Sequence, residues 1–236
     1  MRPAACRLAS KGIIRPVKQL VLDLIPAPLP TFNNFVPGRN REALEASKDA
    51  VFGPSAPKVI YLWGATGSGK SHLAHALGTT PPACFLHAAD IGVLRSGVNC
   101  YALDDVHKLD ELQQIMLFNL INLVGQAGNM GCIVATGNTA ARDLPLRPEL
   151  TSRLGSGLAF QLHPLSDAEK VDALQAHART RSFSLRDDVI AYLLRHARRD
   201  MASLISILDA LDRHSLETGR EITLPMLREM AQPSLL

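Results

Sequence analysis

The stretch YLWGATGSGKSHLAHAL, residues 61–77, decides the fold. It begins with the apolar residues of a buried strand, passes through a glycine-rich turn, and ends in a pattern typical of a helix. Residues 64–71 match G-x-x-x-x-G-K-[ST], the motif of loops that cradle nucleotide phosphates. Because the match falls between a strand and a helix N-terminus, where backbone amides favour an anion, we expect a phosphate-binding loop.

Each residue type of this motif serves the binding of a nucleoside di- or triphosphate. Glycines let amide groups approach the phosphate oxygens without a Cβ in the way. Lys70 is expected to reach the β- and γ-phosphates, and the Ser71 hydroxyl to ligate Mg²⁺, so we predict ADP or ATP and Mg²⁺ as cofactors. The residues predicted to hold the nucleotide are Gly64, Ala65, Thr66, Gly67, Ser68, Gly69, Lys70, Ser71 and His72.

Composition sets broad limits on the rest of the chain. The 236 residues are 47% apolar, enough for one sizeable core or two small ones. The net charge of +3 comes without dense Lys/Arg clusters, and no apolar run is long enough to cross a bilayer, so we expect neither direct nucleic-acid reading nor a membrane partner. None of the four cysteines forms a C-x-x-C pair, which indicates reduced, buried thiols in the cytoplasm.

Strand and helix patterns alternate around the opening stretch. Strands are expected at 58–64, 83–88, 100–105, 131–138 and 158–162, and helices at 40–52, 71–78 and 110–128. Asn40 is a predicted N-cap, and Gly78 is predicted to close the helix that follows the loop. Strands alternating with helices indicate an α/β fold, with a parallel five-stranded sheet flanked by helices.

The texture changes after His163. Helical patterns follow one another at 166–182, 186–198, 200–219 and 223–231 without a strand between them, and Ser166 with Glu169 forms a predicted capping box. We therefore expect a nucleotide-binding α/β domain over 31–163 and a small all-helical lid domain over 164–236.

Residues 1–30 are predicted to be a flexible leader. The first 18 residues carry no acid and lack the apolar centre of a secretory signal, so we expect a disordered leader, with the working chain beginning near Val17. Pro26, Pro28 and Pro30 then predict an extended linker.

Polar residues at the ends of two predicted strands complete the expected site. Asp104 ends the strand at 100–105 and is the predicted second Mg²⁺ ligand beside Ser71, while Asp105 would face the γ-phosphate and orient a water. Asn138 ends the next strand and would point into the same crevice. Taken alone, Asp-Asp and Asn after a strand are common turn signals, so the preceding phosphate loop carries these assignments.

Three further patterns have a plain structural explanation. Arg147 and Arg153 fall on a short helical segment, where a solvated arginine is the ordinary alternative to a functional one. His72 and His75 form an H-x-x-H pair on the phosphate-binding helix, but without a third ligand suitably spaced we do not expect a metal there. The apolar stripe of Leu112, Ile115, Met116 and Leu120 has helical spacing and is expected to be core.

In combination, these motifs resemble an AAA+ module of the DnaA/Hda family. The phosphate loop, LDD at 103–105, TGN at 136–138, SRLG at 152–155 and the helical lid occur in that order. The segment TFNNFVPGRN, residues 31–40, is similar to the one that opens the DnaA AAA+ domain. The segments 147–154, 161–185 and 198–229 look most like the Hda branch of the family, the DnaA-related regulators, and the likeness spans residues 19–229.

The leader carries a second motif. The sequence QLVLDL at 19–24 fits Q-L-x-L-x-L, a form of peptide that docks on the sliding clamp of DNA polymerase. In an extended peptide Leu20, Leu22 and Leu24 would enter pockets while Gln19 hydrogen-bonds at the rim. The alternative is an alternating edge strand of the chain's own sheet. The position ahead of a Pro-rich linker and an Hda-like module favours the clamp, the β subunit of the polymerase.

The resemblance implies a negative regulator of replication initiation. Such a protein, holding nucleotide and tethered to the clamp, stimulates hydrolysis of the ATP bound to DnaA through an arginine finger in trans, which matches Arg153 here. Its partners would be DnaA, the clamp and, through the clamp, DNA; a homo-oligomer is also compatible. Its own ATPase would be weak or absent, and its location the bacterial cytoplasm, at the nucleoid through the clamp. The alternatives are a DnaC-type helicase loader and an autonomous AAA+ remodelling ATPase.

One position departs from the family pattern. The chain has Ala202 where the DnaA lid carries a sensor arginine at the start of a helix. Arg198 and Arg199 lie close by in the sequence and are candidates to replace it.

Overall fold

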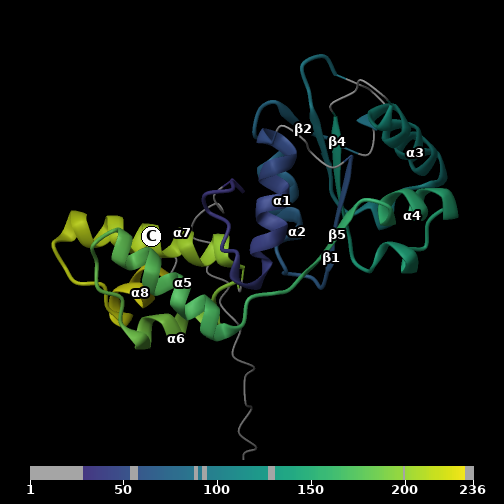
Figure 1. Cartoon of the computed structure of the whole chain (residues 1–236). Coiled ribbons are helices and arrows are strands. Elements are labelled where there is room, and N and C mark those ends of the chain that lie inside the picture. The colour runs from purple at the N-terminus through teal and green to yellow at the C-terminus, as the bar shows by residue number, and fades with distance from the viewer. Residues whose placement is uncertain are drawn as a thin grey trace, which may run out of the picture.

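A computed structural model describes residues 29–53, 58–87, 90–91, 95–126, 131–198 and 200–231. Within them the chain forms an α/β part and a helical part, joined by the segment that follows the last strand (Figure 1). The predicted fold class, a parallel five-stranded sheet flanked by helices and followed by a helical region, is confirmed.

The sheet places the phosphate loop at its centre. Its strands are β1 Val59–Gly64, β2 Ala83–Phe85, β3 Cys100–Leu103, β4 Cys132–Gly137 and β5 Leu158–Leu162. They run parallel in the order β2-β3-β4-β1-β5. Because β1 is paired on both sides, with Tyr61 opposite Ala135 of β4 and Ala159 of β5, the loop after β1 rises from a strand that is held firmly.

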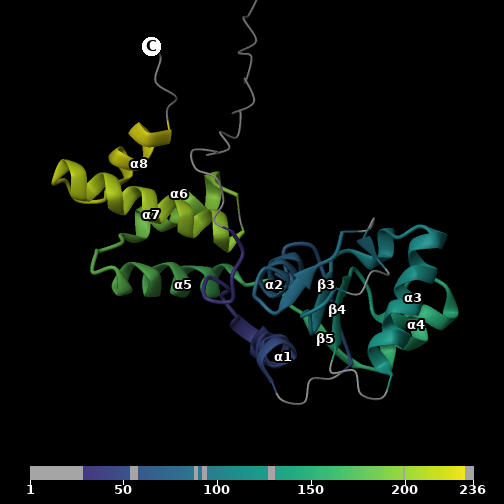
Figure 2. The same cartoon turned by 90° about the horizontal axis from the view of Figure 1, so that it is seen from above.

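Helices cover both faces of the sheet. Helices α1 Arg41–Phe52 and α2 Lys70–Gly78 lie on the face nearer the helical part, and α3 Glu111–Gly125 and α4 Pro148–Gly155 lie on the other (Figures 1 and 2). Alternate residues of β1 enter the two cores: Ile60 and Leu62 pack with α1 and α2, and Tyr61 packs with α3 and α4. Short 3-10 helices occur at η1 Gly38–Asn40, η3 Val106–Lys108 and η4 Ala141–Asp143.

The helical part has its own core. Its helices are α5 Asp167–Thr180, α6 Asp187–His196, α7 Met201–Thr218 and α8 Leu224–Ala231. Leu174, Leu193, Leu204 and Met226, one from each helix, are fully buried in a single cluster. The predicted capping box is confirmed, because the Ser166 side chain accepts from the Glu169 amide while Glu169 accepts from the Ser166 amide.

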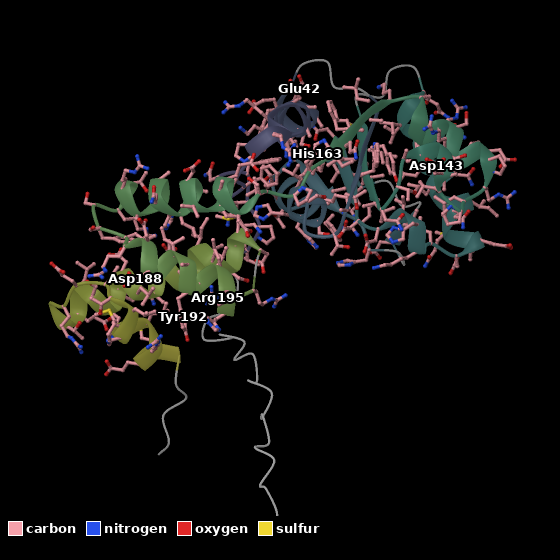
Figure 3. The ribbon with its side chains drawn as sticks, turned by 90° about the horizontal axis from the view of Figure 1, so that it is seen from below. Glu42, Asp143, His163, Asp188, Tyr192 and Arg195 are labelled. Carbon is pink, nitrogen blue, oxygen red and sulfur yellow. The ribbon has the colours of Figure 1, made fainter. Side chains whose placement is uncertain are left out.

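Asn40 precedes α1 as predicted, but its side chain does not cap the helix. Its Nδ2 donates to the His163 carbonyl, and its Oδ1 accepts from the His163 amide, both at 2.8 Å. His163 lies where the chain leaves β5 for the lid (Figure 3). Asn40 is 5% exposed, so this pair of hydrogen bonds ties the start of α1 to the junction of the two parts.

Two other local expectations are met only in part, for packing reasons. Gly78 is the last residue of α2 and has no positive φ; a Cβ there would lie 2.6 Å from the Phe85 Cβ, so the glycine permits close contact with β2. Leu112 and Ile115, expected in the core, are 66% and 40% exposed. The other two residues of the expected stripe are in place, since Leu120 is fully buried and Met116 packs against the core, and the buried face of α3 also includes Leu117.

Candidate nucleotide-binding site

The loop between β1 and α2 has a backbone that only glycines adopt easily. Gly67 and Gly69 have φ angles of +79° and +97°, in the region that L side chains avoid. A Cβ at Gly69 would also lie 2.8 Å from Phe35 Cε2. Helix α2 begins at Lys70 without a side-chain cap, so no side chain occupies the amides of its first turn. This is the backbone that binds phosphate groups in P-loops.

Two polar side chains of the loop are buried. Ser68 is 4% exposed, and its Oγ has no hydrogen-bond partner, an arrangement that suits a site where a phosphate oxygen would complete the bonding. Lys70 is 8% exposed, and its Nζ donates to the carbonyls of Gly64 and Ala65, both at 2.9 Å. Burial lowers the pKa of Lys70, whereas Asp105 and Asp104 act in the opposite direction, so the carboxylates favour the charged form that binds phosphate.

The loop opens into a cavity of about 420 Å³. Three segments form its wall: the loop with the start of α2, the segment 29–36, and the lid around α5 and the start of α7. Phe35, Val36, Leu165 and Met201 give it an apolar side opposite the polar loop. An apolar wall with a few polar groups at one end is the usual design of a small-molecule site and fits a nucleotide, base against the wall and phosphates on the loop.

His72 was predicted in the nucleotide set and lines this cavity. Its Nε2 is 3.0 Å from the Thr31 carbonyl, and its ring lies 5.4 Å from that of Phe35. The pKa of His72 is lowered, chiefly by burial, so the ring is neutral at pH 7 and its Nε2–H donates to Thr31. The histidine therefore holds the segment 29–36 against α2 and shapes the wall.

The two predicted acids, which follow β3, make different contacts. Asp104 accepts a hydrogen bond from the Thr136 hydroxyl, and Thr136 in turn accepts from the Asp105 amide at 2.9 Å. Asp105 has a left-handed backbone, and its carboxylate lies 2.5 Å from Lys108 Nζ. Thr136, a fully buried hydroxyl in β4, was missed by the sequence reasoning, although a polar residue within an apolar strand run was a signal for it.

The donor set suits Mg²⁺ only together with a nucleotide. Among the described residues, no group of three or more His, Cys, Asp or Glu side chains could hold a metal ion. Mg²⁺ is commonly bound through one or two protein oxygens and substrate phosphates, and the Ser71 hydroxyl and Asp104 carboxylate offer such oxygens. Bound there, Mg²⁺ would neutralise charge on the β- and γ-phosphates.

Asn138 is not among the residues that line the loop cavity. It is exposed at the end of β4 and lines a second cavity of about 600 Å³ with Trp63, Arg142 and Gly155. The adjacent turn is fixed by the Tyr61 hydroxyl, which donates to the Thr139 carbonyl at 2.7 Å. The structure thus brings Thr136, rather than Asn138, to the acids after β3.

Arg153 lies on α4, across the sheet from α2 (Figure 1). It is exposed, does not line the loop cavity, and has its guanidinium carbon 5.9 Å from the centroid of the Phe118 ring of α3. Arg147, the other arginine of this segment, occupies the N-cap position of α4 and is also exposed.

The lid residues that line the cavity are only partly those expected. Ala202 does line the cavity, at the start of α7. Arg198 does not: its Nε lies 3.7 Å from Asp200 Oδ2, and its side chain is 64% exposed. Lys170 of α5 lines the cavity and was not singled out in the sequence. Arg199 and the clamp-motif residues Gln19, Leu20, Leu22 and Leu24 lie outside the described residues.

Solved structures of AAA+ proteins share this architecture. DnaA from Aquifex aeolicus, bound to AMPPCP, has a TM-score of 0.62 at 23% identity over 83% of this chain and 68% of that one. Domain III of Thermotoga maritima DnaA has a TM-score of 0.60 at 21% identity over 87% of this chain and 100% of that one. At such identities the likeness shows the fold alone.

The lid matches a family model. Residues 167–231 match the family model of the Hda lid domain. This chain is thus similar to Hda in its lid and to DnaA in its fold.

A solved structure of lower identity also shares the fold. A variant of Thermotoga maritima RuvB has a TM-score of 0.54 at 18% identity over 88% of this chain and 72% of that one. In the part of the chain that is described, no helix combines the length and the apolar character needed to cross a membrane.

Proposed function

We propose that this protein is a negative regulator of replication initiation that triggers the hydrolysis of ATP bound to DnaA. In this proposal it holds ADP or ATP with Mg²⁺ in its own cavity and is tethered to the DNA sliding clamp. Arg153 then enters the nucleotide site of a neighbouring DnaA. The family match and the geometry of α4 support this assignment.

The setting of Arg153 is the observation that carries the proposal. Its side chain is exposed, has no acidic partner among the described residues, and lies across the sheet from the helix that begins at the chain's own phosphate loop. An arginine in that place is free to serve another molecule's nucleotide rather than its own. The Phe118 ring beneath it limits its freedom while leaving its donors free.

The chemistry asked of Arg153 is electrostatic. A guanidinium beside the γ-phosphoryl group stabilises the charge that develops there during hydrolysis, an effect of about 10³–10⁵ in comparable switch systems. The chain's own nucleotide has a different role. Since the segment 29–36, the loop and the lid all line one cavity, a bound nucleotide would hold them in the arrangement that docks on DnaA.

The tether rests on the sequence. The peptide QLVLDL at 19–24 precedes residue 29, from which the described segment leads into the wall of the cavity. A clamp left on DNA after synthesis would thereby concentrate the regulator where initiators have to be switched off.

The test measures hydrolysis of ATP already bound to DnaA, with clamp-loaded DNA present. We expect the intact protein to accelerate hydrolysis and Arg153→Ala to lose the acceleration. Arg147→Ala, which removes an exposed arginine from the N-cap of the same helix, is the matched control and should retain activity. No acceleration by the intact protein would refute the proposal and direct attention to helicase loading or to ATP turnover by the protein alone.

The tether is tested separately with Gln19→Ala. The variant should lose capture on immobilised clamp and the clamp-dependent part of the stimulation, while its affinity for ADP stays unchanged. Capture of the variant at the level of the intact protein would exclude residues 19–24 as the clamp-binding peptide.

A further inference from the structure

The lid places one cationic side chain in the wall of the nucleotide cavity. Among the described residues that line this cavity, Lys70 and Lys170 are the only lysines, and there is no arginine. Lys70 belongs to the phosphate loop, whereas Lys170 lies in the first turn of α5, beyond the junction at His163. The two lysines therefore reach one cavity from the two parts of the molecule.

The Lys170 side chain is largely covered, although its ion pair is long and its partner is exposed. Its side chain is 13% exposed, and its Nζ lies 3.7 Å from an oxygen of Asp167, a residue whose own side chain is 60% exposed. Lys48 on α1 makes a pair of the same spacing with Glu45, at 3.1 Å and with 36% of the lysine side chain exposed. A side chain that is largely covered but has only this long ion pair leaves its ammonium with donors to spare, and an anionic ligand in the cavity would take them.

The other charged groups at this end of the lid do not fill that role. Arg198 points to Asp200 from outside the cavity and is largely exposed. Asp200 lines the cavity, but its carboxylate accepts from the Ser203 amide at 2.8 Å as the cap of α7. Its negative charge would repel a phosphate at the start of α7, which leaves the side of α5 for the phosphates.

We propose that Lys170 binds the phosphate groups of the nucleotide from the lid side, and so couples the position of the lid to nucleoside di- and triphosphates. This rests on the proposed nucleotide site. A phosphate chain held by both Lys70 and Lys170 would join the α/β part to the lid. Charge-assisted hydrogen bonds of this kind are among the stronger polar contacts in proteins.

The experiment measures the affinity of the full chain for ADP by calorimetry, in the unaltered protein and in four variants, Lys170→Met, Lys170→Arg, Lys48→Met and Arg198→Met. Lys170→Met removes the charge and keeps the length of the side chain; we expect affinity to fall about ten- to a hundredfold, as for the loss of one charged hydrogen bond. Lys170→Arg should retain most of the affinity. Lys48→Met, which breaks an ion pair of the same spacing away from the cavity, should bind ADP like the unaltered protein.

The thermal midpoint without nucleotide separates binding from folding. Lys170→Met should match the unaltered protein, because the long ion pair with the exposed Asp167 contributes little to stability. If Lys170→Met and Lys48→Met bind ADP equally well, the inference is overturned and the nucleotide site stands. If Arg198→Met is the variant that loses affinity, Arg198 is the lid cation instead. If the unaltered protein binds neither ADP nor ATP, the proposed function itself fails.

Discussion

Replacing Asn40 by alanine tests how the two parts of the molecule are joined. The side chain makes two hydrogen bonds of 2.8 Å with the main chain of His163 and is 5% exposed. Alanine removes both bonds and leaves the His163 amide and carbonyl without these partners. Leaving a buried polar group unpaired costs about 1–3 kcal/mol. Because His163 is only half-buried, water can reach part of this backbone, and we expect a loss of about 2 kcal/mol in the free energy of unfolding.

The assay is urea unfolding followed by circular dichroism, with a thermal scan as a second readout. About 2 kcal/mol corresponds to a fall of roughly 4–8 °C in Tm for a chain of this size. Asn40→Asp keeps the acceptor but loses the donor to the His163 carbonyl, so it should be no better than alanine. Asn138→Ala, an exposed asparagine, is the control and should change stability by less than about 0.5 kcal/mol. A loss for Asn40→Ala as small as that of the control would refute the reasoning.

Three further changes follow from the site. Gly69→Ala should cost about 1–3 kcal/mol of stability and abolish ADP binding, because the φ of Gly69 is +97° and the new Cβ would clash with Phe35. The Cβ of Gly67→Ala would meet no atom within 4 Å, so this variant should lose less stability in a parallel thermal scan. Thr136→Val leaves Asp104 and the Asp105 amide without their shared partner, so the free energy of unfolding should fall by about 1–3 kcal/mol. Calorimetry should show a weaker Mg²⁺ dependence of ADP binding, and an unchanged dependence would contradict Asp104 as a Mg²⁺ ligand. Ser166→Ala should cost about 1 kcal/mol through the lost capping box. The pKa of Glu169 is lowered by its hydrogen bonds from the Ser166 amide and hydroxyl. The stabilisation that Glu169 adds to the capping box is therefore present above the ordinary pKa of Glu169 and is lost as pH falls through the lowered pKa. An equal effect of Ser166→Ala at neutral and strongly acidic pH would contradict this role of Glu169.

What the sequence predicted well depends on neighbours along the chain. The phosphate loop, the five strands and the Ser166–Glu169 box are local patterns, and each appears where it was expected. The helix boundaries of the lid follow in the same way, from caps and apolar periodicity.

The failures depend on contacts between distant segments. Asn40 was assigned to the nearest helix, but its partner lies 123 residues away. Gly78 faces Phe85 of β2, and Leu112 and Ile115 are exposed because α3 has apolar residues on more than one face. Sequence spacing does not say which apolar face is buried, nor which polar side chain finds a remote main-chain partner.

The site divides along the same line. The residues of the phosphate loop could be predicted from the motif. The wall of the cavity could not, because it is formed by the distant segments 29–36, 165–170 and 200–202. Lys170 is not part of a recognisable motif, and the TGN motif does not reveal that Thr136 contacts Asp104. Both contacts become visible only when the lid and β4 are in place.

The central claim is that one nucleotide is bound by this chain while its arginine acts on another. The most direct measurement determines, for Arg153→Ala and Lys70→Ala, both the affinity for ADP and the stimulated hydrolysis of DnaA-bound ATP. We predict that Arg153→Ala binds ADP like the unaltered protein and stimulates no hydrolysis, whereas Lys70→Ala fails in ADP binding. If Arg153→Ala lost ADP binding or kept its stimulation, the arginine would not be acting in trans, and the account would be contradicted.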